Sequence, residues 1–302
     1  MSTNKRHDIV TFGEVLWDIL PSSYLPGGAP ANVAYHLTKL GMNPAVVSRV
    51  GDDELGKQLC NEFTNRGVCT KYFQLDTEYA TGKVFAEVQA SGDISYEIVE
   101  PVSWDNIIHD DDLELLVKNS DYFVFGSLAV RRQESRETLF KLLEIAPFCI
   151  CDINLRTPHY DQQIIETLLY KTDLLKLNLD EINILAGMFA LPLNNRDTLV
   201  ALAKQFDIKE ILLTQGENGS VYFDGNAVYD QPAYKIELVD PIGAGDAFLA
   251  GFIWSKCFNL MPSESLKYAA ALGGLVAGRA GACPDYTTRD IEKLIRCSQS
   301  QN

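Results

Sequence analysis

The sequence has no apolar stretch long enough to cross a membrane or to form the hydrophobic segment of a signal peptide. Its first residues, MSTNKRHDIV, pass from polar side chains directly into a short strand-like run, so we expect neither export nor membrane anchoring. The seven cysteines include no CxxC pair and the four histidines share no ligand spacing, which argues against a disulfide framework and a zinc site. These absences favour a protein of the reducing cytoplasm.

Positive charge is also scarce. The chain has 26 Lys and Arg residues against 41 Asp and Glu residues, a formal net charge of -15. Such a charge repels nucleic acid and anionic membrane surfaces, which leaves small molecules as the expected partners. An anionic ligand would have to meet a local positive site rather than the field of the whole protein.

The composition is otherwise that of an ordinary globular protein. Hydrophobic residues make up 46% and charged residues 22% of the 302 residues, which excludes a disordered, collagenous or coiled-coil chain. This length allows one large α/β domain with a small appendage, or two equal domains. Because no linker rich in Pro, Gly and Ser divides the chain, we expect a single domain over residues 1–302.

Short apolar runs of strand length alternate with helical patterns along the chain. This alternation predicts βαβ units and a mainly parallel sheet. The later strand candidates are apolar on both faces, as buried parallel strands must be. The strand candidates are residues 8–20, 44–51, 121–130, 147–155, 172–178 and 210–216.

Two segments have the alternation of antiparallel hairpins. Residues 81–100 alternate on either side of Ser91-Gly92-Asp93, which predicts an inserted flap at about 80–100, together with strands near 12–25. Residues 219–230 turn at Asp224-Gly225-Asn226 and are expected to form an antiparallel edge of the main sheet.

The stretch DPIGAGDAFLAGF, residues 240–252, puts an aspartate behind two glycines at the start of an apolar helix. The preceding YKIELVD is strand-like, and we expect the helix to begin at about Ala244. The first turn of a helix has unpaired N–H groups and the positive end of the dipole, and Gly243 and Gly245 allow close approach of an anion. The alternative is that Asp246 only complements the helix dipole.

A second glycine-rich helix start follows in PSSYLPGGAPANVAYHLTKLG. Gly27 and Gly28 allow close backbone approach, and Asn32 offers an amide to a polar ligand. The alternative is a simple turn with Asn32 as a helix cap. Neither glycine-rich segment is a Walker loop or the Rossmann fingerprint.

Together, GGAPANVAYHLTKLG and DPIGAGDAFLAGF resemble the two signatures of the ribokinase-like (phosphofructokinase-B) carbohydrate kinases, and the order of the motifs between them agrees over roughly the whole chain. With GEVLWDILP before it and VSRVGDDELG after it, the first signature resembles that of fructokinases most closely. The resemblance implies a three-layer α/β/α, doubly wound, mainly parallel sheet with a small β lid.

The implied activity is transfer of the ATP γ-phosphate to a hydroxyl of fructose. The alternative acceptors are 2-keto-3-deoxygluconate, ribose and a nucleoside, and a non-catalytic sugar sensor is an alternative from another class. Because lid strands either pair with a second lid or stay as a flap, the lid is also a candidate surface for a homodimer.

The resemblance assigns roles at the helix start near Ala244. Asp246 matches the base that takes the proton of the attacking hydroxyl, and the N–H groups of Gly243, Ala244 and Gly245 match the anion hole. Phosphoryl transfer depends on positioning and charge stabilisation, and a base beside a helix N-terminus supplies both.

The sugar site is implied at Asp18, Gly28 and Asn32, since these match positions that contact sugar hydroxyls in the family. Arg156 belongs to a D-x-N-x-R stretch, residues 152–156, whose alternate residues share one side if the strand continues. It is a candidate clamp for phosphate or for the polar end of the substrate. Arg131 is a further substrate candidate, or else part of a solvated helix start.

The nucleotide and its metal are implied further along the chain. Asn178 and Glu181 match the NxxE motif that organises Mg²⁺, largely through water, although the same pair also suits a capping box. Lys176 either neutralises phosphate charge or is an ordinary solvated lysine.

The remaining implied positions lie in two loops. Thr214, Gly216 and Gly219 match the loop that passes close to ATP. Asp240 and Ile242, with the loop RAGACPD of residues 279–285, overlie the region in which relatives bind a monovalent cation mostly through backbone carbonyls, which makes them candidates for a K⁺ site.

Overall fold

The computed structural model describes residues 7–20, 23–88 and 94–299. The chain divides into two compact units, which are described separately below. Unit 1 comprises Met1–Thr38 and Asn43–Pro147, and unit 2 comprises Lys39–Met42 and Phe148–Asn302. Within the described ranges, no helix is both long and apolar enough to span a membrane.

Unit 1 contains a parallel sheet with buried, apolar strands. Its strand order is β8 (Tyr122–Gly126), β1 (Ile9–Phe12), β4 (Ala45–Gly51) and β5 (Phe73–Asp76). All four residues of β1 are buried, and this strand pairs on both edges, with β4 and with β8. The helical segments of the unit are α1 (Ala29–Lys39), α2 (Glu54–Asn65), η1 (Ser103–Asn106), α3 (Asp111–Lys118), η2 (Ser127–Val130) and α4 (Gln133–Leu143).

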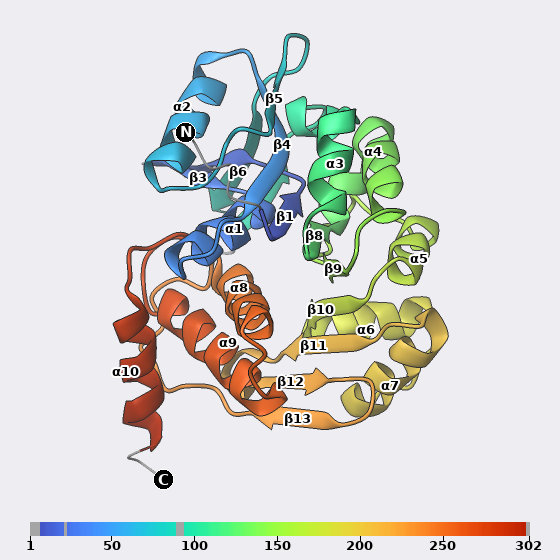
Figure 1. The fold of residues 1–302 in the computed structure, drawn as a ribbon, viewed down its shortest axis with the longest axis vertical. Helices are drawn as coiled ribbons and strands as arrows, with labels where there is room; N and C mark the ends of the chain where they lie inside the picture. Colours follow the sequence, from blue (N-terminus) through green and yellow to red (C-terminus); the bar gives the residue numbers. More distant parts are fainter. Residues whose placement is uncertain (1–6, 21–22, 89–93, 300–302) are drawn as a thin grey trace. The chain divides into compact units, whose positions relative to one another are not determined.

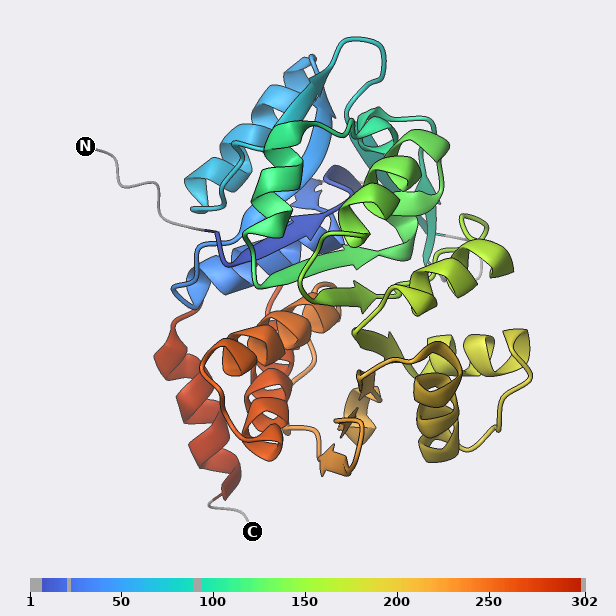
Figure 2. The same ribbon diagram turned by 45° about the vertical axis from the view of Figure 1, so that its right-hand side comes forward.

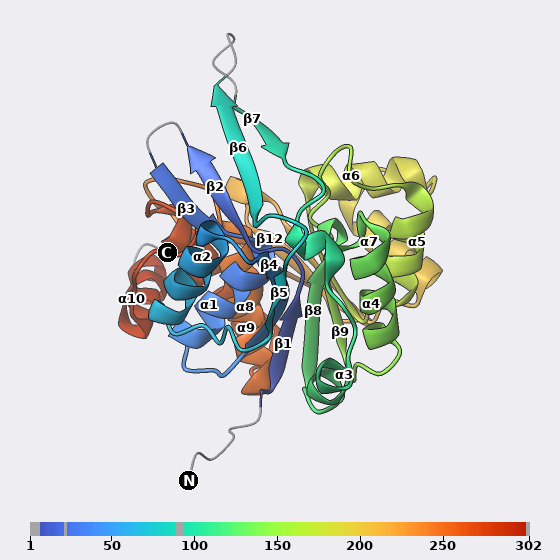
Figure 3. The ribbon, with the colours of Figure 1, turned by 90° about the horizontal axis from the view of Figure 1, so that it is seen from above.

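A second, four-stranded sheet belongs to the same unit. Its order is β3 (Ser23–Gly27), β2 (Leu16–Leu20), β6 (Gly82–Val88) and β7 (Ile94–Ile98), as Figure 3 shows. β2 pairs antiparallel with β3 and parallel with β6, while β6 pairs antiparallel with β7. Residues far apart in the sequence thereby become neighbours, since Asp18 pairs with Leu25 on one side and with Val84 on the other.

Unit 2 contains three parallel strands followed by an antiparallel hairpin (Figure 1). The order is β9 (Cys149–Asp152), β10 (Leu174–Asn178), β11 (Glu210–Thr214), β12 (Ser220–Phe223) and β13 (Val228–Gln231). Helices α8 and α9 lie on one side of β11 to β13, with α6 and α7 on the other (Figure 2). The helical segments are α5 (Gln162–Tyr170), α6 (Leu179–Met188), α7 (Asn195–Phe206), η3 (Gly216–Asn218), α8 (Ala244–Cys257), α9 (Pro262–Ala277) and α10 (Thr288–Gln299).

Several helices begin at an aspartate whose side chain caps the first turn. Asp53, Asp110 and Asp161 accept hydrogen bonds from the N–H groups of the residues three positions later, at 2.7, 2.8 and 2.9 Å. These bonds satisfy N–H groups that have no partner within the helix. The start of α2, α3 and α5 is thus encoded locally in the sequence.

Most of the expected elements are confirmed in type, but not always in extent. The hairpin of residues 219–230 is β12 and β13, and the helix expected from about Ala244 begins there. The hairpin of residues 81–100 is β6 and β7, while its predicted turn, Ser91-Gly92-Asp93, lies outside the described residues.

Four strand predictions require correction. Residues 8–20 form two strands in different sheets, because the chain changes direction at Gly13, whose φ is 142°. Residues 121–130 end as a 3₁₀ helix after Gly126, and the strand of residues 147–155 ends at Asp152. The expected strand of residues 234–240 is wrong, because the N–H groups of Val239 and Asp240 donate to the carbonyl of Ala277 in α9 instead of to a neighbouring strand.

Candidate active site

Asp18 lies in β2, the second strand of the four-stranded sheet of unit 1. Its carboxylate occupies the space beside Gly27 on the neighbouring strand β3. A Cβ on Gly27 would lie 2.3 Å from Oδ2 of Asp18. The first glycine of the GG pair therefore leaves room for the carboxylate, and any larger residue there would displace it.

Gly28 and Asn32 lie directly after β3, at the start of α1. Gly28 has a φ of 113°, and a Cβ there would lie 2.3 Å from the backbone oxygen of Glu14. The Glu14 side chain is 3% exposed, and its Oε1 accepts a hydrogen bond from the N–H of Ala29 at 3.2 Å. Asn32 is 5% exposed, and its N–H donates to the Gly28 carbonyl, so it belongs to the first turn of α1 and is not the cap.

Arg131, also in unit 1, is buried and donates hydrogen bonds to two residues. Its side chain is 2% exposed, which contradicts the solvated alternative. Nε and Nη2 donate to the two carboxylate oxygens of Asp105 at 2.6 and 2.8 Å, and Nη2 also donates to the Val99 carbonyl at 2.8 Å. The guanidinium lies 3.9 Å from the ring centroid of Trp104. Two carboxylate contacts and an aromatic face together compensate for burial of the charge.

In unit 2, the start of α8 is built on a close backbone contact. Gly243 precedes the helix with a φ of 77°, and a Cβ there would lie 2.5 Å from Cα of Ala282. Only glycine combines this positive φ with such an approach. Asp246 lies in the first turn of α8, and the N–H of Ala244 at the helix start donates to the Pro241 carbonyl at 3.3 Å. This arrangement has the chemistry of an anion site beside a carboxylate.

Lys176 is buried below the same turn. Its Nζ donates to both carboxylate oxygens of Asp152 at 2.8 Å, and a Cβ on Gly245 would lie 3.2 Å from Nζ. Burial disfavours the ammonium, but the charges of Asp152, Glu181 and Asp246 outweigh this effect and raise the pKa of Lys176. Lys176 is therefore a fixed cation, and the solvated alternative is wrong.

Asn178 and Glu181 form a reciprocal capping box at the start of α6. Asn178 Oδ1 accepts from the N–H of Glu181 at 2.9 Å, and Glu181 Oε2 accepts from the N–H of Asn178 at 2.8 Å. Glu181 Oε1 accepts from the N–H of Leu155 at 3.0 Å. Burial raises the pKa of Glu181, although Lys176 and the two backbone N–H groups act in the opposite direction.

These oxygens fit a hydrated divalent ion better than a directly ligated one. Among the residues that the structure describes, no three His, Cys, Asp or Glu side chains gather as a metal site. Carboxylate and amide oxygens suit Mg²⁺, which keeps several waters and takes few protein ligands. Each Glu181 oxygen accepts one backbone hydrogen bond and retains acceptor capacity, whereas Asn178 Oδ1 already accepts from the N–H groups of Asp180 and Glu181, both at 2.9 Å.

The expected one-sided array of residues 152–156 is not formed. β9 ends at Asp152, and Asn154 has a φ of 40°, so the extended conformation that would align alternate residues stops there. Asp152 points to Lys176 inside unit 2, whereas Arg156 is exposed. The structure does not group Arg156 with Asp152.

The loop from Thr214 to Gly219 follows β11. Gly216 and Gly219 have φ values of 57° and 96°, and a Cβ on Gly219 would lie 2.1 Å from the backbone oxygen of Gln231. Thr214 donates a long hydrogen bond, 3.4 Å, to the Leu177 carbonyl of the adjacent strand. A side chain would therefore be obstructed at Gly219, whereas a Cβ on Gly216 would meet nothing within 4 Å and only the positive φ favours glycine there.

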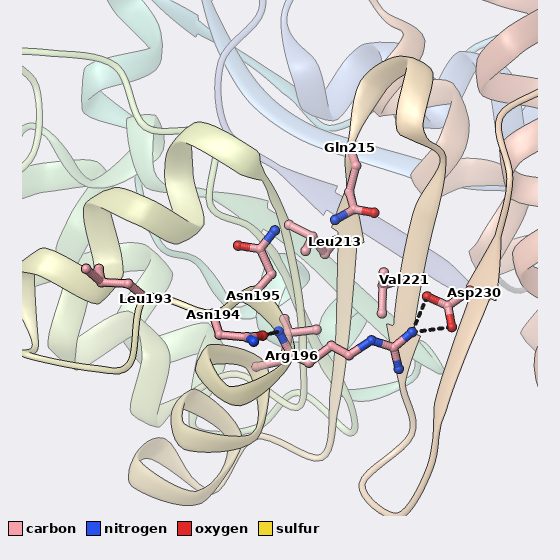
Figure 4. A pocket seen from close by; sticks show the side chains of 9 residues that line it. Leu193, Asn194, Asn195, Arg196, Leu213, Gln215, Val221 and Asp230 are labelled. Carbon is pink, nitrogen blue, oxygen red and sulfur yellow. Dashed lines mark hydrogen bonds and ion pairs between the residues drawn. The ribbon is translucent and has the colours of Figure 1, made fainter.

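An open cavity of about 500 Å³ lies beside this loop, on the side of α7 (Figure 4). Gln215 and Asn195 point into it, and Arg196 donates to both carboxylate oxygens of Asp230 at its edge, at 2.7 and 2.5 Å. The lining residues are Leu193, Asn194, Asn195, Arg196, Leu199, Leu213, Gln215, Val221 and Asp230.

Asp240 connects two loops of unit 2. Its carboxylate accepts hydrogen bonds from the N–H of Ile242 at 3.0 Å and from the N–H of Gly281 at 2.9 Å. The side chain therefore joins the turn before α8 to the loop that contains Ala282. A cation at this place would be held by backbone carbonyls, since the carboxylate already serves this connection.

Sequence reasoning missed Asp105, and it grouped the loop of residues 279–285 with Asp240 and Ile242 without connecting Ala282 to Gly243. Asp105 pairs with Arg131, which lies 26 positions away, and Ala282 meets Gly243 across two loops. Neither residue has a local spacing or a neighbouring motif that connects it to its partner. For Asp105, the only available signal is that a buried arginine needs a carboxylate.

The profile of the pfkB family carbohydrate kinases matches residues 10–289. The chain belongs to this family. It is therefore a carbohydrate kinase, and the two glycine-rich helix starts lie within the matched residues.

The most similar proteins include fructokinases. The chain is 28% identical to a probable fructokinase-5 of Arabidopsis thaliana, over 95% of this chain and 97% of the relative. A structure of a fructokinase with bound ATP from Xylella fastidiosa superposes with a TM-score of 0.86 at 23% identity, covering 97% of this chain and 99% of that one.

Two further structures agree in fold. A 2-dehydro-3-deoxygluconokinase from Thermotoga maritima gives a TM-score of 0.84 at 22% identity, over 96% and 100% of the two chains. A Vibrio cholerae fructokinase with fructose, ADP and calcium ion bound gives 0.82 at 22% identity, over 95% and 99%. The kinase thus has the ribokinase-like α/β fold that the sequence motifs implied.

Gly243→Ala tests the close contact at the start of α8. The positive φ alone costs an alanine about 1–2 kcal/mol, and the overlap with the Ala282 backbone adds to this. We expect a lower free energy of unfolding in urea and a large loss of kinase turnover. Gly41→Ala is the control, because Gly41 has a φ of 83° with nothing within 4 Å. Equal losses of stability in the two variants would contradict the contact.

Asp105→Ala tests the buried ion pair. It leaves the Arg131 guanidinium with only the more exposed Glu100 carboxylate, 3.8 Å from Nε, and it also removes the acceptor of the Val102 N–H. Loss of the close partner of a buried pair costs about 3–5 kcal/mol. Asp230→Ala breaks the pair with Arg196, whose side chains are 56% and 54% exposed, and should cost at most about 1 kcal/mol. Urea unfolding of both variants measures the difference, and a loss below about 1 kcal/mol for Asp105→Ala would show that the pair is dispensable.

Proposed function

We propose that the kinase is a fructokinase, which transfers the γ-phosphate of ATP to a hydroxyl of fructose. The observation that carries this proposal is the start of α8. Asp246 lies in the first turn of this helix, and Gly243, directly before it, packs against Ala282. The names of the similar fructokinases support the choice of sugar.

In the proposed reaction, Asp246 accepts the proton of the attacking hydroxyl. The N–H groups of Gly243, Ala244 and Gly245 stabilise the charge of the transferring phosphoryl group, as a helix N-terminus does for bound anions. Lys176 adds a fixed positive charge below Gly245, and Asp152 holds it in place. Positioning and electrostatics of this kind supply most of the catalysis in phosphoryl transfer.

The acceptor sugar would bind to residues of unit 1. Asp18 would accept hydrogen bonds from two hydroxyls, and these are strong because the acceptor is charged. Gly28 and Asn32 would complete the contacts at the start of α1. Arg131 would contribute Nη1, which has no hydrogen-bond partner among the described residues. The sheet of β3, β2, β6 and β7 would act as the lid.

ATP would lie against the loop of Thr214, Gly216 and Gly219. Mg²⁺ would be held through water by Asn178 and Glu181, and it would supply neutralisation of phosphate charge. K⁺ is proposed at the carbonyls of the turn from Asp240 to Ile242.

The setting of the enzyme is also part of the proposal. The free cysteines Cys149 and Cys151 are buried and the chain is strongly acidic, which suits a cytoplasmic enzyme of small molecules. The lid sheet is the surface through which we would expect a homodimer to form.

A second candidate acceptor is 2-keto-3-deoxygluconate. The exposed guanidinium of Arg156 is the group that would bind its carboxylate, and one similar structure is a 2-dehydro-3-deoxygluconokinase. Fructose has no carboxylate and would not require this contact.

A coupled assay of ADP formation distinguishes the candidates. The purified chain is offered ATP and Mg²⁺ with fructose, 2-keto-3-deoxygluconate, ribose or adenosine, and without any acceptor. We expect the highest kcat/KM with fructose and no ADP without a sugar. A higher kcat/KM with 2-keto-3-deoxygluconate that is lost in Arg156→Ala would show that the acid, and not fructose, is the acceptor.

Asp246→Asn tests the proposed base. Loss of a general base lowers turnover by about 10²–10⁴-fold, and we expect this loss with little change in sugar affinity measured by calorimetry. Asp18→Ala should have the opposite effect, with a weaker sugar affinity and a smaller loss of turnover. Near-normal turnover of Asp246→Asn would remove Asp246 from the proposed role.

A further inference from the structure

The carboxylate of Asp53 caps α2 and also holds a distant strand. Oδ1 accepts from the N–H of Gly56 at 2.7 Å, the ordinary capping bond, and from Oγ1 of Thr81 at 2.7 Å. Oδ2 accepts from the N–H of Thr81 at 2.9 Å. Two of its three hydrogen bonds therefore go to a residue 28 positions away, which capping alone does not require.

Thr81 immediately precedes β6, the strand that pairs with β2. It is fully buried, and its Oγ1 also accepts from the N–H of Gly51 at 3.1 Å. Gly51 and Gly56 surround it closely, since a Cβ on Gly51 would lie 2.7 Å from the Thr81 nitrogen and one on Gly56 would lie 2.8 Å from Oγ1. The start of β6 is thus fixed to the first turn of α2 without space for adjustment.

The same helix turn holds the other strand of the pair. Nε1 of Trp17 in β2 donates to the carbonyl of Leu55 at 3.0 Å, and Trp17 is 5% exposed. Trp17 directly precedes Asp18, which lies opposite Val84 of β6 in the sheet register. The first turn of α2 therefore holds both strands next to Asp18.

We propose that the first turn of α2 is a positioning element for the acceptor site, and that Asp53, through Thr81, sets where β6 places β2 and its Asp18. This proposal rests on the proposed function in one respect only, namely that Asp18 binds the acceptor sugar. Asp53 itself is a positioning residue, because it acts through the two strands.

The charge of Asp53 suits this role. Burial raises the pKa of its carboxyl, but hydrogen bonds from Thr81 and Gly56 and the charge of Lys83 more than offset this and lower it overall. The carboxylate is therefore ionised near neutral pH, and hydrogen bonds to an ionised acceptor are stronger than those between neutral groups.

Asp53→Asn separates the tether from the cap. Asparagine caps helices as well as aspartate does, and its oxygen can keep the bond to Gly56. Its amide nitrogen would then face the N–H of Thr81, so that two donors meet where a bond existed. We expect KM for the sugar to rise about tenfold, from loss of a hydrogen bond to a charged group, with kcat and KM for ATP changed by less than about twofold.

Asp110→Asn is the matched control. Asp110 caps α3 in the same unit through the N–H of Leu113 at 2.8 Å, with no bond to the four-stranded sheet among those that the structure gives it. The same substitution at the same helix position should leave KM for the sugar unchanged. A similar KM in the two variants would overturn the proposal.

A second pair of variants acts from the strand side. Thr81→Val keeps a β-branched residue of similar size but removes the hydroxyl, whereas Thr81→Ser restores it. Valine should reproduce the rise in KM for the sugar and serine should return it towards the wild-type value. If serine and valine behave alike, the hydroxyl does not position β6. If Asp53→Asn fails to fold, the two Thr81 variants still test the proposal.

Amide hydrogen exchange supplies a readout that needs no substrate. In Asp53→Asn, amides of residues 16–19 and 82–85 should exchange faster, while those of β1 and β4 stay protected. Faster exchange throughout unit 1, or none in β2 and β6, would overturn the proposal. If the wild type uses another sugar than fructose, that sugar replaces fructose in every kinetic comparison, so failure of the substrate assignment remains distinguishable from failure of the tether.

Discussion

The start of α8 depends on a close contact between two backbone segments, one at Gly243 and one at Ala282, with no side chain between them. Gly243 takes a positive φ and lies against Ala282, and Asp240 fixes the approach by binding N–H groups of both segments. A helix N-terminus binds anions only if its N–H groups are accessible and rigid. The loop that supplies Ala282 is therefore as much a part of this arrangement as the GAGD stretch itself.

Buried cations in this acidic protein are each matched to a carboxylate. Lys176 is held by Asp152 below the α8 turn, and Arg131 is held by Asp105 against Trp104. An unpaired buried charge is costly, so each pair fixes the position of its cation as well as neutralising it. A chain with a net charge of -15 thereby keeps positive charge at fixed places in its interior.

Glycines in both units create space for particular neighbours. Gly27 leaves room for the Asp18 carboxylate, Gly245 for Lys176, and Gly51 and Gly56 for Thr81. In each place a polar group lies where a Cβ would otherwise be. The start of α1 in unit 1 and the start of α8 in unit 2 are therefore built by the same means, and both depend on side chains that are held against rigid elements.

The sequence by itself determined the local features. Glycine pairs, capping aspartates and apolar runs predicted most elements, the start of α8 and the family, because helix starts and buried strands depend on nearby residues. It could not give the end of β9 at Asp152 or the path of residues 234–240, since these depend on which distant backbone groups are available as partners. Only the tertiary structure decided that Lys176 and Arg131 are buried, that Asp105 holds Arg131, and that Asp53 reaches Thr81. These contacts join residues far apart in the chain, and no periodicity or spacing encodes a pairing that arises only when separate elements pack together.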